Sequence, residues 1–426
     1  MDLFYISLVS YLVGIILIFL ASKNLFSYQL LFAAYIFPAA VVASEGVFFL
    51  MSIGIFSIGV GNLFCNVITF FRPQQSLLKF RNSEVISYFS PRKIFATNLI
   101  LLFFVFTLLS SIYFYLAGIS LFGDEVGYDR LVNRHSVSGS YFFQRLFRVY
   151  LPIICMIYLM YSWHHSYKPF FNRGIFFIML IATSLLLIFT GMRGNLVIFI
   201  FFPFVVLFGL VSKGNPFFLI LRVFLLTFFG GMIVTQLMYP ELDIVQLLEL
   251  ILARITTGAT DGISYMYSTD VPINGFYNGS TYFNDILSIF AKLSLVETNA
   301  QTYGSYLANE MLGAKYNGEQ AAVYIMGELY ANFSYFGVFF GCFIAGIFLQ
   351  LLYVITLHSK KDILFTPILC YFQAAFIAIL GGPTLSMTFD YLITITFFIF
   401  TFFILMIFLS YTGGYVIFNR NLIKLR

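Results

Sequence analysis

The chain of 426 residues is 61% hydrophobic, has only 10% charged residues and has a mean hydropathy of +0.94. A water-soluble domain of this length needs far more charge on its surface, so the composition excludes soluble classes and predicts a polytopic membrane protein. The formal charge of +5 fits anchoring at a membrane surface and requires no nucleic-acid partner, and the four cysteines lie in apolar runs without the spacing of a disulfide framework or a metal site.

Apolar segments of about 20 residues, enough to cross a hydrocarbon core of about 30 Å, recur along the chain. The segment 322–357 is longer than one crossing, so its N-terminal part is expected to protrude or to lie at the interface. We see no repeat and no low-complexity linker, which predicts one integral membrane domain over residues 1–426. The expected fold is all-α, with about 11 membrane-spanning helices near residues 3–21, 25–43, 46–71, 94–117, 146–163, 174–191, 195–211, 216–239, 322–357, 363–381 and 391–412.

Basic residues in short loops set the orientation. The loop 72–93 contains five Lys and Arg residues, so we place it in the cytoplasm. Alternating from there puts the N-terminus outside and the C-terminus inside. The other inside segments are then all basic: Lys23, HHSYKPFFNR, SKGN, HSKKD and the tail NRNLIKLR.

Three outside segments carry the candidate polar chemistry. They are 118–145, the turn GMRGN, and residues 240–321, which we expect to form a helical extracytoplasmic cap. Within the cap, DIVQLLELILARITTGATDGISYMY predicts an amphipathic helix broken at Gly258, and STYFNDILSIFAKLSL predicts a shorter, interfacial helix.

Lys and Arg are normally enriched in inside loops, so each arginine in an outside segment requires a reason to be retained there. Arginine suits phosphate because its planar guanidinium group donates paired hydrogen bonds and stays charged. A group of them therefore indicates a lipid-linked phosphate or diphosphate, whereas the structural alternative is a set of interfacial anchors or ion pairs. Eight basic residues lie outside, six of them arginines: Arg130, Arg134, Arg145, Arg148, Arg193, Arg254, Lys292 and Lys315.

Arg193 is the only charged side chain between Gly174 and Val211. Gly191 and Gly194 beside it allow a tight turn and close approach of a ligand. Asn195 can cap the next helix, whose N-terminus favours anions. This pattern predicts a phosphate-binding site. The alternative is a short interfacial turn with one anchoring charge.

Few acidic or basic side chains are candidates for proton transfer. Glu328 lies where a long apolar segment begins, and a carboxylate there is either paired or faces a polar cavity in which it could act as a base. His135 is the only outside histidine, and it is a second candidate base or an ordinary loop residue. Asp124 and Glu125 could bind a divalent cation, although such a loop is more often simply solvated. Nucleotide-binding and hydrolase motifs are absent from the sequence.

Two motifs carry a resemblance to a known family. The turn TGMRGNL, the large outside segment and then GELYANFSYFGVFFGCFIAGIF resemble the bacterial O-antigen (oligosaccharide repeat unit) polymerases of the Wzy type. The late pattern of Gly327, Glu328, Asn332 and Gly337 is the more distinctive part. The turn from Gly191 to Gly194 is shared with other membrane glycan enzymes, and the two arginine-containing repeats described for some members are not found.

The resemblance implies an inner-membrane glycosyltransferase, of the kind grouped with GT-C folds, without cofactor or metal. It would join oligosaccharide repeat units carried on undecaprenyl diphosphate at the periplasmic face. The implied partners are this lipid-linked substrate, membrane lipid, a chain-length regulator (co-polymerase) and a flippase. The chemistry requires a base near the attacking hydroxyl and cations near the departing diphosphate. The assigned residues are Glu328 and His135 for catalysis, Arg193, Arg254, Arg130 and Arg145 for the diphosphate, and Gly191, Gly194 and Asn332 for support.

Three other functions are alternatives, and the sequence fits each of them less well. An O-antigen ligase is expected to have a histidine in the late outside loop, and 240–321 has none. A mannosyltransferase-like GT-C enzyme would have an acidic pair after its first span, whereas Asp124 and Glu125 follow the fourth. A flippase or transporter would show internal symmetry and charges deep in several spans.

Overall fold

The computed structural model describes residues 2–86, 89–90, 92–119, 140–164, 169–190, 194–213, 215–256, 260–292, 296, 300–312, 321–381, 384–412 and 417–418. It divides into two compact units. Unit 1 comprises Met1–Lys79, Glu241–His358 and Gln373–Tyr391, and unit 2 comprises Phe80–Pro240, Ser359–Phe372 and Leu392–Arg426.

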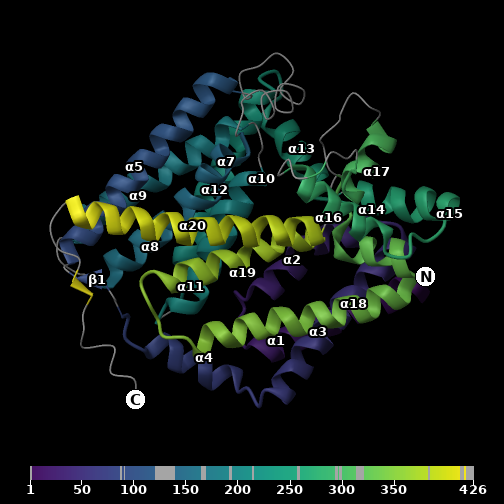
Figure 1. Cartoon of the computed structure of the whole chain (residues 1–426). Helices are drawn as coiled ribbons and strands as arrows, with labels where there is room; N and C mark the ends of the chain where they lie inside the picture. The colour runs from purple at the N-terminus through teal and green to yellow at the C-terminus, as the bar shows by residue number, and fades with distance from the viewer. Residues whose placement is uncertain are drawn as a thin grey trace. The chain divides into compact units, whose positions relative to one another are not determined.

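Almost all of the described chain is helical (Figure 1). Short π-helical turns interrupt the α-helices at three points of the described chain. The first half contains α1 (Asp2–Ser22), α2 (Tyr28–Val42), α3 (Glu45–Ile68), α4 (Pro73–Asn82), β1 (Phe89–Ser90), α5 (Arg92–Ala117), α7 (Ser140–Arg145), η2 (Leu146–Tyr150), α8 (Leu151–His164), α9 (Pro169–Phe189), α10 (Gly194–Leu196), η3 (Val197–Phe201) and α11 (Phe202–Val211). The second half contains α12 (Phe217–Met238), α13 (Ile244–Thr256), α14 (Asp261–Tyr265), η4 (Met266–Asp270), α15 (Val271–Asn274), α16 (Ser280–Lys292), α17 (Tyr303–Leu312), α18 (Tyr324–His358), α19 (Phe365–Gly381), α20 (Thr384–Thr412) and β2 (Ile417–Phe418).

Apolar helices confirm the predicted all-α polytopic class. Within the described residues, eight helices are long and apolar enough to cross a membrane. The predicted spans 25–43, 363–381 and 391–412 fall on α2, α19 and α20, whose described apolar stretches are shorter. The eight are Leu3–Ser22, Glu45–Ile68, Phe95–Ala117, Phe142–Trp163, Phe171–Phe189, Gly194–Val211, Phe217–Met238 and Tyr324–His358.

In unit 1, α3 packs against both α1 and α18 (Figure 1). Glycines allow the backbones of α3 and α18 to come close. A Cβ on Gly61 would collide with the carbonyl oxygen of Phe343, and a Cβ on Gly346 would collide with the backbone of Ile58. Small residues commonly hold helices together where lipid removes the hydrophobic driving force between them.

Gln350 of α18 is the centre of a buried polar cluster in the same unit. Its amide nitrogen donates to Asn66 Oδ1 at 2.8 Å and to the carbonyl of Ala21 at 3.1 Å, and its oxygen accepts from Gln29 Nε2 at 3.3 Å. Polar side chains are tolerated in an apolar interior only when they are hydrogen-bonded. The cluster therefore fixes α1, α2 and α3 in register against α18.

Another face of α18 carries exposed apolar side chains at every fourth position, at Phe336, Phe340, Ile344 and Phe348. Residues four apart share one face of a helix. In a membrane-spanning helix, we expect this face to contact lipid.

Unit 2 is a bundle in which α8 packs against α5 and α9, and α11 packs against α12. The π turn η2 precedes α8. A π turn alters the regular backbone hydrogen bonding of a helix. The hydroxyl of Tyr371 donates to the carbonyl of Arg148 in this turn at 2.6 Å, which joins α19 to the bundle.

Three basic segments predicted to lie inside meet in unit 2. The N–H of Ile86, in the loop after α4, donates to the carbonyl of Lys361, in the loop after α18, at 2.8 Å. Strand β1 of the first loop pairs antiparallel with β2 of the C-terminal tail, with Phe89 opposite Phe418. Segments that bond in this way share one side of any membrane that the chain crosses; that this side is the inner one stays a prediction.

The close contact between α3 and α18 gives a test of the fold. We expect Gly61→Ala to lower the free energy of unfolding by about 1–3 kcal/mol, because the backbones must separate to admit the methyl group. Gly231→Ala in α12 is the control, since no atom lies within 4 Å of the added Cβ. Thermal unfolding of the detergent-purified chain measures the difference, and equal stability of the two variants would contradict the proposed packing.

Candidate functional site

The long helix α18 is broken after its first nine residues. Phe333 has φ −138° and ψ 19°, and Ser334 has φ 58° and ψ −163°, both outside the helical region. A positive φ at a residue other than glycine persists only where surrounding contacts hold it. The break separates Tyr324–Asn332 from Tyr335–His358, which alone is long enough for one crossing.

Carbonyl groups before the break lack the partners that a continuous helix provides, and the loop after α15 supplies them. The N–H of Tyr277 donates to the carbonyl of Ala331 at 2.9 Å, and the N–H of Asn278 donates to that of Asn332 at 3.2 Å. The loop from the predicted cap is thereby attached to α18.

The side chain of Asn332 is fully buried and strengthens this attachment. Its Oδ1 accepts from the N–H of Gly279 at 2.8 Å, and its Nδ2 donates to Thr281 Oγ1 at 2.6 Å and to the carbonyl of Glu328 at 2.8 Å. Gly279 has a φ of +92°, which glycine adopts without strain. Asn332 was predicted to be a supporting residue of the site, and that role stays a prediction; its contacts show that it attaches the loop before α16 to α18.

Asp270, at the end of the π turn η4, is a shared hydrogen-bond acceptor and is only 3% exposed. Its Oδ2 accepts from the hydroxyl of Tyr303 at 2.6 Å. Its Oδ1 accepts from Tyr277 and from Asn274 Nδ2, both at 2.9 Å, and from Tyr306 at 3.3 Å. A buried carboxylate with several charge-assisted hydrogen bonds holds its donors in fixed orientations.

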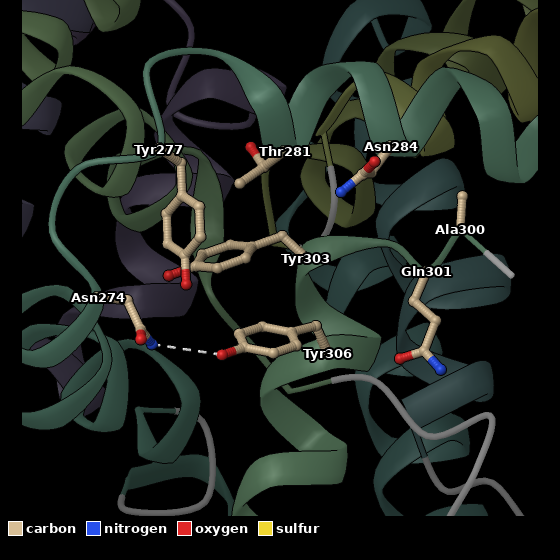
Figure 2. A pocket seen from close by; sticks show the side chains of 8 residues that line it. All are labelled: Asn274, Tyr277, Thr281, Asn284, Ala300, Gln301, Tyr303 and Tyr306. Carbon is tan, nitrogen blue, oxygen red and sulfur yellow. Dashed lines mark hydrogen bonds between the residues drawn. The ribbon is translucent and has the colours of Figure 1, made fainter.

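The oriented tyrosines form one wall of a cavity of about 490 Å³ (Figure 2). The rings of Tyr303 and Tyr306 are stacked, with centroids 6.2 Å apart and planes at 18°. Asn284 and Gln301 lie across the cavity from Tyr277. We call this cavity the tyrosine pocket; its described lining residues are Asn274, Tyr277, Thr281, Asn284, Ala300, Gln301, Tyr303 and Tyr306.

The described lining is polar but uncharged. Burial, then hydrogen bonding to Tyr306 and Asp270, raises the pKa of the Tyr277 phenol, and burial and Asp270 likewise raise that of Tyr303. These phenols therefore stay neutral at physiological pH. Amides and hydroxyls both donate and accept hydrogen bonds, and aromatic faces attract C–H groups. This combination suits a neutral polyhydroxyl ligand such as a saccharide.

Glu328 is 1% exposed and lies one helical turn before Asn332. It is not among the described residues that line the tyrosine pocket, but Asn332 bonds both its carbonyl and Thr281 of the lining. Burial, followed by the nearby charge of Glu328, raises the pKa of the Tyr282 phenol in α16. Glu328 is therefore a buried carboxylate one helical turn from the residue that attaches α18 to the loop before α16.

Several predicted site residues lie outside the described residues. These are the diphosphate-binding Arg130 and Arg193, the catalytic candidate His135 and the supporting Gly191. The side chain of Arg254 also lies outside them, although its backbone belongs to α13. Their assignments remain predictions.

The other predicted residues are placed in the two units. Arg145 ends α7 in unit 2 and is half-buried, whereas Glu328 and Asn332 belong to unit 1. Gly194 begins α10 and is exposed, and an added Cβ would meet no atom within 4 Å. The predicted capping role of Asn195 is wrong, because this residue lies inside α10 and its Nδ2 donates to Thr190 Oγ1 at 2.8 Å.

Comparison of the chain with protein-family models, curated proteins and solved structures finds no match. In the described part of the chain, no group of three or more His, Cys, Asp or Glu side chains is placed to hold a metal ion. The apolar helices and the tyrosine pocket therefore define the chain as a polytopic helical membrane protein with a tyrosine-lined cavity.

Asp270 and the tyrosines around it were not predicted from the sequence. The available signals were the density of Tyr and Asn in YSTDVPINGFYNGSTYFND and the pair Tyr303 and Tyr306, three residues apart on one helix face. Neither signal shows that one carboxylate joins them, because Asp270 and Tyr303 come from different helices.

The role of Asp270 can be tested by Asp270→Asn, which keeps the shape of the side chain but removes its charge. We expect a loss of about 2–3 kcal/mol in stability of the segment 260–312, because charge-assisted bonds weaken and one added N–H lacks an acceptor. Hydrogen exchange of peptides from α14 to α17 measures this. Asp261→Asn, at an exposed position in α14, is the control, and equal protection in both variants would contradict the proposed role.

Proposed function

We propose that the protein is a bacterial inner-membrane glycosyltransferase that polymerises undecaprenyl-diphosphate-linked oligosaccharide repeat units, as O-antigen polymerases do, on the periplasmic face. The observation that carries the proposal is the tyrosine pocket, which is joined through Thr281 and Asn332 to the helix that bears Glu328. A saccharide presents C–H faces and hydroxyl edges, and the pocket offers aromatic faces and amides for them. The resemblance of the late GEL–N–G pattern to those polymerases points the same way.

In the proposed reaction, a sugar hydroxyl of one lipid-linked unit attacks the anomeric carbon of the chain on the other lipid. A new C–O bond forms as the bond from the anomeric carbon to the diphosphate breaks. The hydroxyl proton passes to Glu328, with His135 as the second candidate, and the electron pair leaves with the diphosphate. Glu328 suits this step because a buried carboxylate can have the basicity that proton transfer needs.

The departing diphosphate requires positive charge, and we assign it to Arg193 and Arg254, with Arg130 and Arg145 as auxiliaries. Guanidinium groups can neutralise a diphosphate with paired hydrogen bonds. We also propose that α2, α19 and α20 cross the membrane with the eight longer helices, giving about 11 crossings in a GT-C-like arrangement. Partners in this scheme are a flippase that delivers the units and a co-polymerase that sets chain length.

Deletion of the gene in its host tests the reaction class. We expect the ladder of long polysaccharide to disappear and lipid A core with a single repeat unit to remain, because ligation and flipping do not depend on polymerisation. Gel electrophoresis of lipopolysaccharide distinguishes the functions. Core without any unit would instead indicate a ligase or a flippase, and an unchanged ladder would reject all three.

Two variants test the proposed residues within the complemented strain. Glu328→Gln is expected to slow polymerisation about 10²-fold or more, the lower range for loss of a general base. Asn284→Ala removes an exposed amide from the tyrosine pocket and is expected to weaken substrate use about tenfold, the scale of one lost hydrogen bond. Ser268→Ala, exposed in the same segment, is the control. Normal chain length in both variants at wild-type protein level would reject these site assignments.

A further inference from the structure

Unit 2 contains a second cavity, of about 580 Å³, which is unrelated to the tyrosine pocket. Its walls come from the loop after α4, the end of α8, the loop after α11 and the loop after α18. All three loops belong to segments whose basic residues predict an inside position. The described lining residues are Ser83, Glu84, Val85, Met160, Trp163, Val211, Ser212, Lys213, Leu219 and Lys361.

Lys361 is buried in this cavity, with only 2% of its surface exposed. Its ammonium donates to the carbonyls of Arg81 at 3.0 Å and Val211 at 3.2 Å, which lie at the C-terminal ends of α4 and α11. These two bonds use two of the three donors of a lysine. The ammonium also lies 6.0 Å from the centroid of the Phe80 ring. Within the described part of the chain, no carboxylate forms an ion pair with Lys361, so no acidic side chain there balances its charge.

The charges around the cavity are unbalanced. Burial, and then the positive charges of Lys213 and Arg81, lower the pKa of Lys361 to about 8. Glu84 is the only acidic side chain among the described lining residues. Helix C-termini offset part of the positive charge on Lys361. They do not balance the charge of Lys213, which lines the cavity and forms no ion pair within the described residues.

Apart from Ser83 and Ser212, the remaining lining is apolar, and it includes Trp163, the only tryptophan of the chain. Its ring lies 5.5 Å from that of Phe208 and is 39% exposed. Tryptophan is typical of the boundary between lipid and water. Basic cavities beside apolar helix ends at this boundary commonly accept anionic lipid head groups.

We propose that this cavity binds a phosphate group, held by Lys361 and Lys213 and presented either by an anionic phospholipid of that leaflet or by a free phosphate ester. The apolar wall formed by Met160, Trp163 and Leu219 would contact the rest of the molecule. The site differs in chemistry from the uncharged tyrosine pocket and does not depend on the proposed glycosyltransferase activity.

The proposal is tested by thermal unfolding of the full chain in neutral detergent, titrated separately with phosphatidylglycerol, phosphatidylcholine and inorganic phosphate at constant ionic strength. A ligand that binds the folded state raises the unfolding temperature with its concentration. Stabilisation by phosphatidylglycerol alone identifies a lipid head group, and stabilisation by inorganic phosphate identifies a free phosphate.

Lys213→Ala is the decisive variant, because Lys213 bonds none of the helix ends that Lys361 caps. We expect unchanged stability without ligand and about tenfold weaker binding, the scale of one lost charge-assisted contact. Lys213→Arg should restore binding. Lys360→Ala, an exposed lysine outside the cavity lining, is the matched control. Stabilisation by neither anion, equal stabilisation by phosphatidylcholine, or an equal effect of Lys213→Ala and Lys360→Ala would overturn the proposal.

Discussion

The arrangement of unit 1 depends on the need to satisfy backbone carbonyls where α18 is broken. An apolar helix can be interrupted only if other groups replace its lost hydrogen bonds. Here the amides of Tyr277 and Asn278 and the side chain of Asn332 supply them. Because the partners come from the loop between α15 and α16, the break determines where that loop and the helices on either side attach.

Asp270 extends the same principle from the backbone to the side chains. One buried carboxylate collects hydrogen bonds from Asn274, Tyr277, Tyr303 and Tyr306, which come from α15, the following loop and α17. None of these segments is long enough to be stable alone. The polar contacts therefore both hold these segments together and fix the phenol rings that line the tyrosine pocket. Structure and binding surface share the same residues, so the pocket is preorganised before any ligand arrives.

Sequence reasoning succeeded where the physical signal is local. Hydropathy located the apolar helices, and the excess length of 322–357 indicated that this segment is more than a single crossing. Basic residues also predicted the shared side of the loops that meet at Ile86 and Lys361. Prediction from the sequence failed where the structure depends on tertiary contacts. Asn195 resembles a helix cap but bonds backwards to Thr190, and nothing near Asp270 in the sequence reveals partners more than thirty residues away. The diphosphate-binding arginines remain predictions from composition and resemblance.

The chemistry of the tyrosine pocket also limits which part of the proposed substrate it can bind. Its described lining contains phenols, amides and a threonine but no cation, so it suits sugar rings better than a diphosphate. If the protein transfers glycans, the pocket is therefore better suited to the saccharide part of a substrate, and the diphosphate must find its positive charge elsewhere. Arg193 and Arg254 are the proposed sources. The tyrosine pocket offers no base, because neutral phenols with raised pKa values are poor proton acceptors. Glu328, beside the broken end of α18, is therefore the proposed proton acceptor.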